Sequence, residues 1–283
     1  MVIRAFLAVI FTCLMLAYSQ AETMPSKVIS DQTQDCLVCH ADESPSIVQQ
    51  WRESRHGSTS VGCHECHQAQ KGDSDAFEHN GYTISIIVSP KDCSRCHNKE
   101  VQEFNGSHHA KGGRIIGSID NRLADVIEGN KKMVTPGFPE GVSAAVVNGC
   151  WQCHGSEVKV IAEGKLDPAT WPNTGIGRIN PDGSEGSCSA CHSRHSFSVA
   201  QARSPENCGK CHMGPDHPQE EIYQESKHGI AFSAHKDKMN LSRQPWVLGK
   251  DYGEAPTCAT CHMSATEKQP VTHDVGLRIS WNN

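Results

Sequence analysis

Apolar residues are unevenly distributed along the chain, and only one long run of them occurs, close to its start. Residues 5–18 are almost all apolar, Arg4 precedes them, and the tripeptide Ser-Gln-Ala follows in the small-x-small pattern of a signal peptidase site. We therefore expect a secretory signal peptide over residues 1–21. The alternative is an uncleaved membrane anchor, but the run is shorter than the roughly 20 residues that span a bilayer. Residues 22–283 are then the mature, exported chain, which we expect to form one domain.

Beyond residue 21 the apolar positions form only short stretches, separated by glycine, proline and polar residues. This pattern predicts a mostly α-helical fold of short helices and long loops, with little or no sheet. We expect one helix over residues 121–129, a Pro-Gly-Phe-Pro turn over 136–139 and a loop over 171–187. The GIG sequence in that loop does not indicate a phosphate site, because neither a preceding strand nor a following Lys-Ser/Thr accompanies it.

The composition indicates that side chains alone do not fill the interior. Of the 283 residues only 37% are hydrophobic and 6% aromatic, which makes a thin core for this length. The formal net charge is −6, and lysine and arginine are not clustered, so a nucleic-acid partner is not expected. Another apolar group therefore has to contribute to the core.

The chain has 15 cysteines, and all except Cys13, in the predicted signal peptide, belong to one repeated motif. Seven Cys-x-x-Cys pairs occur, and histidine follows each pair at once. The seven sets are Cys36, Cys39 and His40; Cys63, Cys66 and His67; Cys93, Cys96 and His97; Cys150, Cys153 and His154; Cys188, Cys191 and His192; Cys208, Cys211 and His212; and Cys258, Cys261 and His262. Export favours disulfides, but a disulfide framework has no need of the histidine. Structural zinc remains an alternative for a single Cys-x-x-Cys pair.

Covalent attachment of haem c requires all three residues of the motif. The two thiols add to the haem vinyl groups, and the histidine is held under the iron as its proximal ligand. We therefore predict seven covalently bound haems, whose macrocycles supply the missing apolar interior and whose propionates pair with some of the lysines and arginines. Haem attachment after secretion is typical of a bacterial periplasm or cell exterior, where we expect this protein.

Three further segments share one pattern: an aromatic residue, two residues, serine, one residue, histidine and a small residue. They are residues 51–57, 104–110 and 223–229, and their histidines are His56, His109 and His228. Each segment follows a haem motif at a distance of about one short helix. We expect that helix to present the histidine from its last turn, with the small residue ending it, and the histidine to ligate the iron of a neighbouring haem. Exposed histidines at helix ends are the alternative.

Three more histidines near motifs are candidate distal ligands without the repeat pattern: His79, His195 and His273. Histidines in solvated loops are the alternative for each of them. Together with the repeat histidines they give six distal ligands for seven haems. One iron then keeps an open position where a small molecule can bind and react, whereas a six-coordinate haem only passes electrons.

The motif order and the segments that link the motifs resemble the octahaem hydroxylamine oxidoreductase family. The resemblance is carried by WRESRHG after the first motif, GCWQCH as an isolated fourth motif, WPNTGIGRINPDGSEGSCSACHSRHSFS into the fifth, CHMGPDHPQEEIYQESKHG at the sixth and CHMSATEKQPVTHDVGLRISW at the seventh. These segments cover nearly the whole mature chain. The family has an eighth motif and a long helical C-terminal part, so the resemblance implies a chain truncated after its seventh motif.

The resemblance also implies a multihaem cytochrome c fold and a place for the reaction. In the family the fourth haem is five-coordinate and catalytic, which points to the haem held by Cys150, Cys153 and His154. A distal Asp-His pair of the family matches Asp216 and His217, which on the sequence alone fit a proline-bounded turn. A carboxylate beside an imidazole can deliver or remove protons at nitrogen. The expected function is redox conversion of small nitrogen compounds, either hydroxylamine oxidation or nitrite or hydroxylamine reduction.

The implied partners are a small nitrogen compound and a redox protein, such as a cytochrome or a quinone-linked protein. Because the family forms trimers, the resemblance also implies a homo-oligomer. The alternative function is an electron-transfer cytochrome without catalysis, in which every iron is six-coordinate. A nitrite reductase of the pentahaem type is disfavoured, because the chain contains no Cys-x-x-Cys-Lys motif.

Overall fold

The computed structural model describes residues 28–114, 133–135, 138–142, 149–162, 164–215 and 217–278. The predicted signal peptide, the helix expected over residues 121–129 and Asp216 lie outside these residues. Within them the chain is mostly helical, with long loops and three two-stranded hairpins. The predicted fold class is therefore confirmed. No helix among the described residues has the length and apolar character needed to cross a membrane.

Most of the described helices are short, and several coincide with a haem motif. The α-helices are α2 (Asp31–Glu43), α3 (Pro45–Glu53), α4 (Arg55–Ser58), α5 (Cys63–His67), α6 (Pro90–Gly106), α9 (Cys150–His154), α10 (Val199–Arg203), α11 (Pro205–Gly209), α12 (Gln219–Glu225), α13 (Lys227–His235) and α14 (Cys258–His262). The 3₁₀ helices, each of three residues, are η1 (His109–Lys111), η3 (Cys188–Ala190) and η4 (Lys236–Lys238).

Polar caps and prolines determine where several helices begin. Ser89 caps α6 by accepting from the Lys91 amide at 3.1 Å, while the Asp92 carboxylate accepts from the Ser89 amide at 2.8 Å. Pro90 occupies the first turn, where its missing N–H has no intrahelical partner to lose. Inside α6 the backbone of His97 departs from helical geometry, with φ −110° and ψ 42°. The third motif therefore ends at a kink.

The sheets are three small antiparallel hairpins, β1 (Ala76–His79) with β2 (Tyr82–Ser85), β3 (Met133–Thr135) with β4 (Phe138–Val142), and β5 (Val160–Ala162) with β6 (Lys165–Leu166). The first is the most regular and pairs His79 with Tyr82 across its turn. Asn80 and Gly81 form that turn with φ of 49° and 87°, the geometry that Asn-Gly favours in tight hairpins. The turn thereby fixes His79 at the end of β1.

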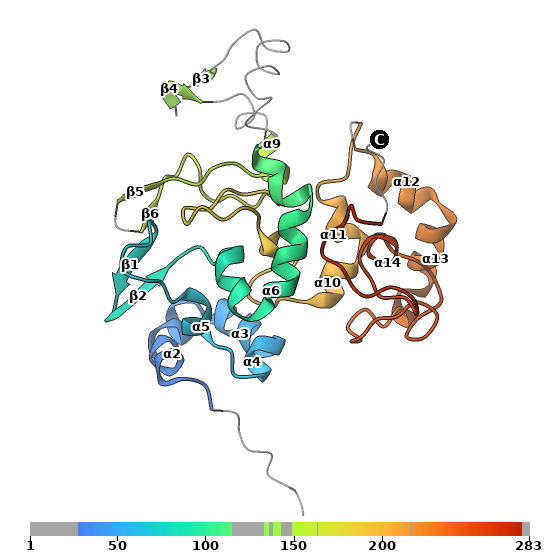
Figure 1. Cartoon of the computed structure of the whole chain (residues 1–283), viewed down its shortest axis with the longest axis horizontal. Coiled ribbons are helices and arrows are strands. Elements are labelled where there is room, and N and C mark those ends of the chain that lie inside the picture. The colour runs from blue at the N-terminus through green and yellow to red at the C-terminus, as the bar shows by residue number, and fades with distance from the viewer. Residues whose placement is uncertain are drawn as a thin grey trace, which may run out of the picture.

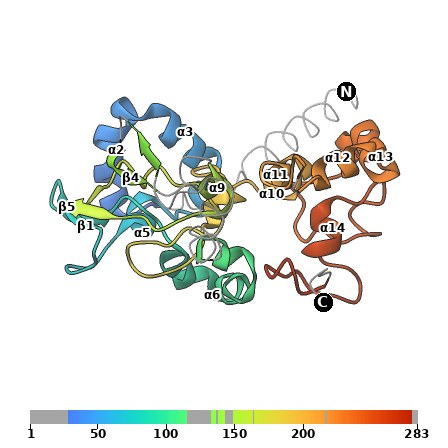
Figure 2. The same ribbon diagram turned by 90° about the horizontal axis from the view of Figure 1, so that it is seen from above.

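The described elements form two neighbouring groups (Figures 1 and 2). Helices α2–α6, the first hairpin and α9 lie in one group, and α10–α14 lie in the other, with α6 running between them in Figure 1. The groups share contacts: Arg55 donates to Gln244, and the His273 amide donates to Glu103 at 2.9 Å. Histidines of one group also lie next to motifs of the other, as described below.

The buried hydrophobic cluster of the described chain lies in the second group, around α13 and α14. It consists of Phe232, Met239, Trp246, Tyr252, Ala255 and Ala259. The rings of Trp246 and Tyr252 stack at 3.9 Å, and the indole N–H of Trp246 donates to the Met239 carbonyl at 2.8 Å. Ala259 of this cluster lies within the seventh motif, so packing of the cluster fixes the position of that motif.

Candidate haem centres and active site

None of the motif cysteines forms a disulfide, so every motif sulfur is available for a thioether bond. Two of the motif histidines are oriented by a backbone carbonyl. His67 donates through Nδ1 to the Ser85 carbonyl at 2.8 Å, and His262 donates through Nδ1 to the Val275 carbonyl at 2.9 Å. Because each Nδ1 carries the proton, the Nε2 lone pair of each ring is left to bind a metal.

Thiols from different motifs lie next to one another and connect the motifs in space. Hydrogen bonds link Cys93 to Cys188, Cys208 to Cys258 and Cys153 to Cys211. Burial raises the pKa of Cys63 and of Cys66 to about 11, and the neighbouring thiols of Cys36 and of Cys93, respectively, add to this effect. The first, second, third and fifth motifs thus form one series, the sixth and seventh motifs are linked to each other, and the fourth motif joins at the sixth.

Apart from the contacts of His217, four pairs of imidazoles in the described residues combine a motif histidine with a histidine from elsewhere in the chain. The ring centres are 6.1 Å apart for His40 and His79, 6.3 Å for His67 and His195, 6.1 Å for His97 and His56, and 6.0 Å for His212 and His109. In each pair, the histidine named second is one of the candidate distal ligands. His56 therefore lies beside the third motif rather than the first, which it follows in sequence, and His109 lies beside the sixth.

These separations fit an iron held between the two rings. A metal–imidazole bond is about 2 Å long and the ring centre lies about 1 Å further out, so imidazoles on opposite sides of one iron have centres about 6 Å apart. Direct stacking would bring flat rings much closer, as Trp246 and Tyr252 show at 3.9 Å. The side chains present therefore fit bis-histidine haem. The assignment of each distal ligand stays a prediction.

Burial keeps many of these imidazoles neutral, which metal binding requires. Burial lowers the pKa of His109 and of His192 to about 4. His273 adds to the effect at His192, so these two histidines are neighbours and the fifth motif has a candidate distal ligand close by. Burial likewise lowers the pKa of His56 and His195.

In the aromatic-Ser-His repeat, the serine forms a junction, called the hinge below, between two consecutive helices. The sequence prediction, which placed the histidine in the last turn of the first helix, was wrong. In the first copy α3 ends before Ser54, whose Oγ donates to the Trp51 carbonyl at 2.6 Å and accepts from the Gly57 amide at 3.1 Å. His56 thus lies in the first turn of α4, not in the last turn of α3. A Cβ on Gly57 would lie 2.3 Å from the Trp51 carbonyl, so the small residue is needed for this contact.

The third copy of the repeat has the same junction, and the second copy shares one of its two serine contacts. Ser226 lies between α12 and α13, donates to the Tyr223 carbonyl at 2.7 Å and accepts from the Gly229 amide at 3.2 Å. Ser107 follows α6 and donates to the Phe104 carbonyl at 2.6 Å. No ring contact between His228 and a motif histidine occurs in the described residues, so its role as a distal ligand stays a prediction.

The fourth motif is held by close backbone contacts with residues 175–177. The amides of Ile176 and Gly177 donate to the Cys153 and His154 carbonyls at 2.9 and 3.0 Å. A Cβ on Gly175 would lie 2.0 Å from the Gly155 nitrogen, which excludes any larger residue there. The GIG sequence thus serves close packing against the fourth motif.

His217 lies opposite the fourth motif, where the resemblance placed a distal group. Its ring centre is 6.4 Å from that of His154, and the same distance separates it from His212. Burial lowers the pKa of His154, and His217 and His212 add to this effect. His212 already has His109 as a closer partner, whereas His217 is exposed and is the nearest histidine to His154. His217 is therefore available to a group bound at the fourth motif.

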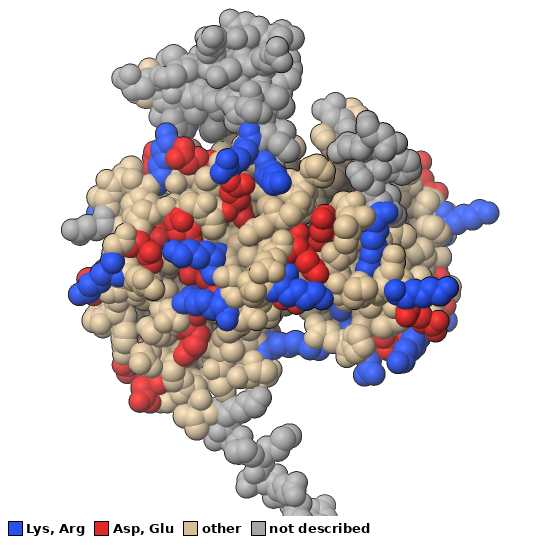
Figure 3. Space-filling model, viewed as in Figure 1, with Lys and Arg blue, Asp and Glu red and all other residues tan. Residues whose placement is uncertain are grey.

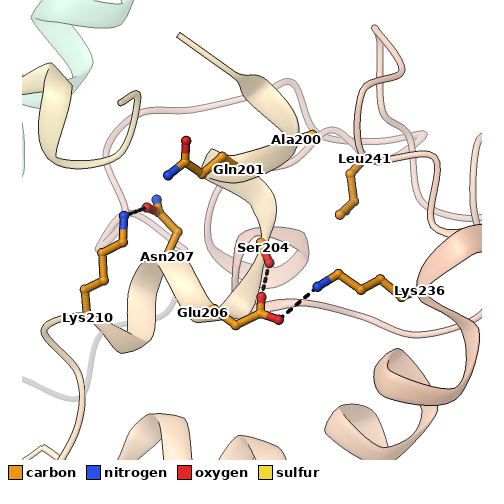
Figure 4. A pocket seen from close by; sticks show the side chains of 8 residues that line it. All are labelled: Ala200, Gln201, Ser204, Glu206, Asn207, Lys210, Lys236 and Leu241. Atoms are coloured by element: carbon orange, nitrogen blue, oxygen red, sulfur yellow. Dashed lines mark hydrogen bonds and ion pairs between the residues drawn. The ribbon is translucent and has the colours of Figure 1, made fainter. Parts of the chain in front are cut away.

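Two other surface features carry no comparable arrangement. A cavity of about 350 Å³ lies between α10, α11 and η4, but its lysines already have partners: Lys210 donates to Asn207 at 2.7 Å and Lys236 pairs with Glu206 at 3.1 Å (Figure 4). On the face shown in Figure 3, basic and acidic side chains are intermixed. Neither feature indicates a site for a large charged partner.

Comparison with protein families shows what the chain is similar to. Residues 182–283 match a family described as "Seven times multi-haem cytochrome CxxCH", and residues 15–68 match "Cytochrome c554 and c-prime". A relative from Kuenenia stuttgartiensis, described as "Probable nitrite reductase-hydroxylamine oxidoreductase fusion protein", is 28% identical over 271 residues. The match covers 86% of this chain and 27% of the relative.

Two solved structures share the fold. A "Hypothetical multiheme protein" is 32% identical with a TM-score of 0.76, covering 89% of this chain and 57% of the other. The "Kuenenia stuttgartiensis reducing HAO-like protein complex Kustc0457/Kustc0458" is 24% identical with a TM-score of 0.58, covering 87% and 44%. The chain thus spans little more than half of the first structure and about a quarter of the curated relative.

The matches agree with the motifs and with the paired histidines. Covalently bound haem c, with its iron, is the cofactor. The chain is similar to multihaem c-type cytochromes and is related to a hydroxylamine-oxidoreductase-like protein.

Proposed function

We propose that the chain carries seven haems and converts a small nitrogen compound at the haem of Cys150, Cys153 and His154, with the other haems passing electrons. The observation that supports this most directly is the position of His217. The centre of its exposed imidazole lies 6.4 Å from that of His154, close enough to reach a molecule bound at the fourth motif. The reaction is either hydroxylamine oxidation or nitrite or hydroxylamine reduction.

The bound haem would supply an iron that holds the nitrogen compound and exchanges electrons with it. The chain's own contribution is proton handling and positioning. Each electron pair taken from or given to nitrogen is accompanied by protons, and His217 with the adjacent Asp216 can hold or release them at the nitrogen atom. The backbone contacts of Cys153 and His154 keep the motif fixed relative to His217.

Electrons would leave or reach this site through the sixth motif. Cys153 of the fourth motif lies next to Cys211 of the sixth, and Cys208 of the sixth lies next to Cys258 of the seventh, so the haems attached to these motifs would be neighbours. A multielectron reaction needs such a reservoir next to the reacting haem. We propose a periplasmic or otherwise exported protein that exchanges these electrons with a redox protein, and that forms a homo-oligomer.

The distance between His217 and His154 also favours a second function. The 6.4 Å between His217 and His154 is close to the spacing of the four other pairs, so His217 also fits as an axial ligand. The fourth haem would then be six-coordinate, and the chain would be an electron-transfer cytochrome without catalysis.

Replacing His217 separates the two functions. In the catalytic case His217→Ala lowers kcat about 10²–10⁴-fold for hydroxylamine oxidation or for nitrite reduction, with the number of high-spin haems unchanged. His235→Ala, in the same half of the molecule, is the matched control and keeps full turnover. If the wild-type protein has no turnover and His217→Ala creates one new high-spin haem, His217 is a ligand and the proposal is wrong.

A further inference from the structure

Arg178 is a buried cation without a carboxylate partner. Its side chain is in the interior, with only 2% of the residue exposed. Nε donates to Asn180 Oδ1 at 2.6 Å and Nη1 donates to the Asn173 carbonyl at 3.2 Å, and both acceptors are neutral. Among the described residues no carboxylate lies within ion-pair distance of this guanidinium. Burying an unpaired charge is costly, so an anion is expected here.

A second arginine increases the need for an anion. The guanidinium carbons of Arg178 and Arg194 lie 5.5 and 5.8 Å from the centre of the Trp171 ring. The indole attracts both cations, but the cations repel one another. Burial lowers the pKa of Arg178 to about 10, and Arg194 is the next largest cause. Two positive charges therefore meet at one aromatic ring.

The negative groups nearby do not neutralise this pair once haem is attached. The acidic groups that most favour the charged form of Arg178 among the described residues are the Cys188 thiol, the Asp182 carboxylate and the Cys93 thiol. Thioether formation turns both thiols into neutral sulfur. Asp182 is engaged elsewhere, because it accepts from Ser89 Oγ at 2.5 Å and from the Ser184 amide at 2.9 Å.

We propose that Arg178 and Arg194 form the binding site for a propionate carboxylate of one of the covalently bound haems. Haem c brings two carboxylates into the protein, and the planar fork of a guanidinium matches a carboxylate with two parallel hydrogen bonds. Cys93 of the third motif and Cys188 of the fifth are both close enough to Arg178 to affect its pKa, so the arginine lies beside these two haem attachment sites. The site thus stabilises the reduced iron of that haem, because reduction adds a negative charge near two cations.

This inference requires haem binding but not the nitrogen chemistry proposed above. It is tested by spectroelectrochemical titration of the haem-loaded protein, with the Arg178→Gln and Arg194→Gln variants. The control is Arg243→Gln, since Arg243 is 64% exposed and already paired with Asp251 at 3.4 Å. Haem content is determined by mass for every variant.

The expected result is a lower midpoint potential for one haem in Arg178→Gln. Its reduction equilibrium constant falls at least tenfold, which for one electron is 59 mV. Arg194→Gln shifts the same haem by less, and Arg243→Gln shifts none. In Arg178→Gln this potential also becomes dependent on pH, because the uncompensated propionate takes up a proton on reduction.

Unchanged potentials in both variants overturn the proposal. If Arg178→Gln does not mature, Arg194→Gln decides, because Arg194 is exposed and its loss leaves the interior intact. A free oxyanion is the other source of the same chemistry. If the wild-type potentials change with added sulfate, and the variant shift disappears after anion removal, a free anion occupies the site and the propionate assignment is wrong.

Discussion

Gly57→Ala tests the hinge that presents His56. A Cβ at residue 57 would lie 2.3 Å from the Trp51 carbonyl oxygen, whereas ordinary contacts begin at 3.4 Å. The carbonyl or the first turn of α4 must therefore move by about 1 Å, a displacement of the kind that overpacking causes at a cost of about 1–3 kcal/mol. The same carbonyl accepts from Ser54 Oγ at 2.6 Å, so the shift also weakens a buried hydrogen bond worth about 1 kcal/mol.

The net effect on stability is worked out from these opposing contributions. Alanine is favoured over glycine within a helix by about 1 kcal/mol, which offsets part of the loss. We expect Gly57→Ala to lower the free energy of unfolding by about 1–3 kcal/mol. The ring centres of His56 and His97 are 6.1 Å apart in the wild type. The substitution should move His56 away from His97, so one haem should change from low-spin to high-spin.

The assay is guanidinium unfolding of the haem-loaded protein, followed by circular dichroism, with electron paramagnetic resonance of the oxidised form. Gly106→Ala is the matched control, because it lies at the end of α6 and its Cβ would meet no atom within 4 Å. We expect the control to be as stable as the wild type or up to about 1 kcal/mol more stable. A Gly57→Ala protein with wild-type stability and an unchanged spectrum would refute the hinge.

Three further predictions follow from individual contacts. His195→Ala removes the partner of His67 and should convert one haem to high-spin with haem content unchanged, as seen by magnetic resonance and mass, whereas His235→Ala should not. Ser226→Ala removes the cap of α13 and should lower the free energy of unfolding by about 1 kcal/mol in denaturant titration; no loss would contradict the capping role. Burial, helped by neighbouring aspartates, raises the pKa of Asp75 to about 6, so its charged form destabilises the fold and stability falls as pH rises from about 4 to 6. Asp75→Asn should therefore be more stable than the wild type at pH 7 and equal to it at pH 4, and a loss at pH 7 would show that the charge is needed.

Local chemistry in the sequence was enough to predict the haem motifs and the helical fold class. The Cys-x-x-Cys-His pattern needs only five consecutive residues, and the repeat around His56 and His228 was visible from its serine and glycine. The geometry of the repeat could not be predicted, because the sequence does not distinguish a serine between two helices from a serine within one helix. The structure adds that Ser54 and Ser226 end one helix and begin the next.

Which histidine lies beside which motif could not be predicted from the sequence. His109 is 103 positions from His212 in the chain, and tertiary contacts between the two groups, such as that of the His273 amide with Glu103, bring them together. One signal was missed: Asn80-Gly81 predicts a tight hairpin, which would have fixed His79 at a strand end. Arg178 was missed for a different reason, since the burial of a single arginine depends on contacts from distant segments.

The most direct measurement is the electron paramagnetic resonance spectrum of the oxidised, haem-loaded protein, before and after addition of hydroxylamine or nitrite. With haem content fixed by mass, we expect one high-spin haem among low-spin bis-histidine haems, and its signal should change when the nitrogen compound binds. The Cys153→Ser variant, which removes an attachment point of the fourth haem, should lose this signal alone. Entirely low-spin haems that do not respond to either compound would contradict a catalytic fourth haem.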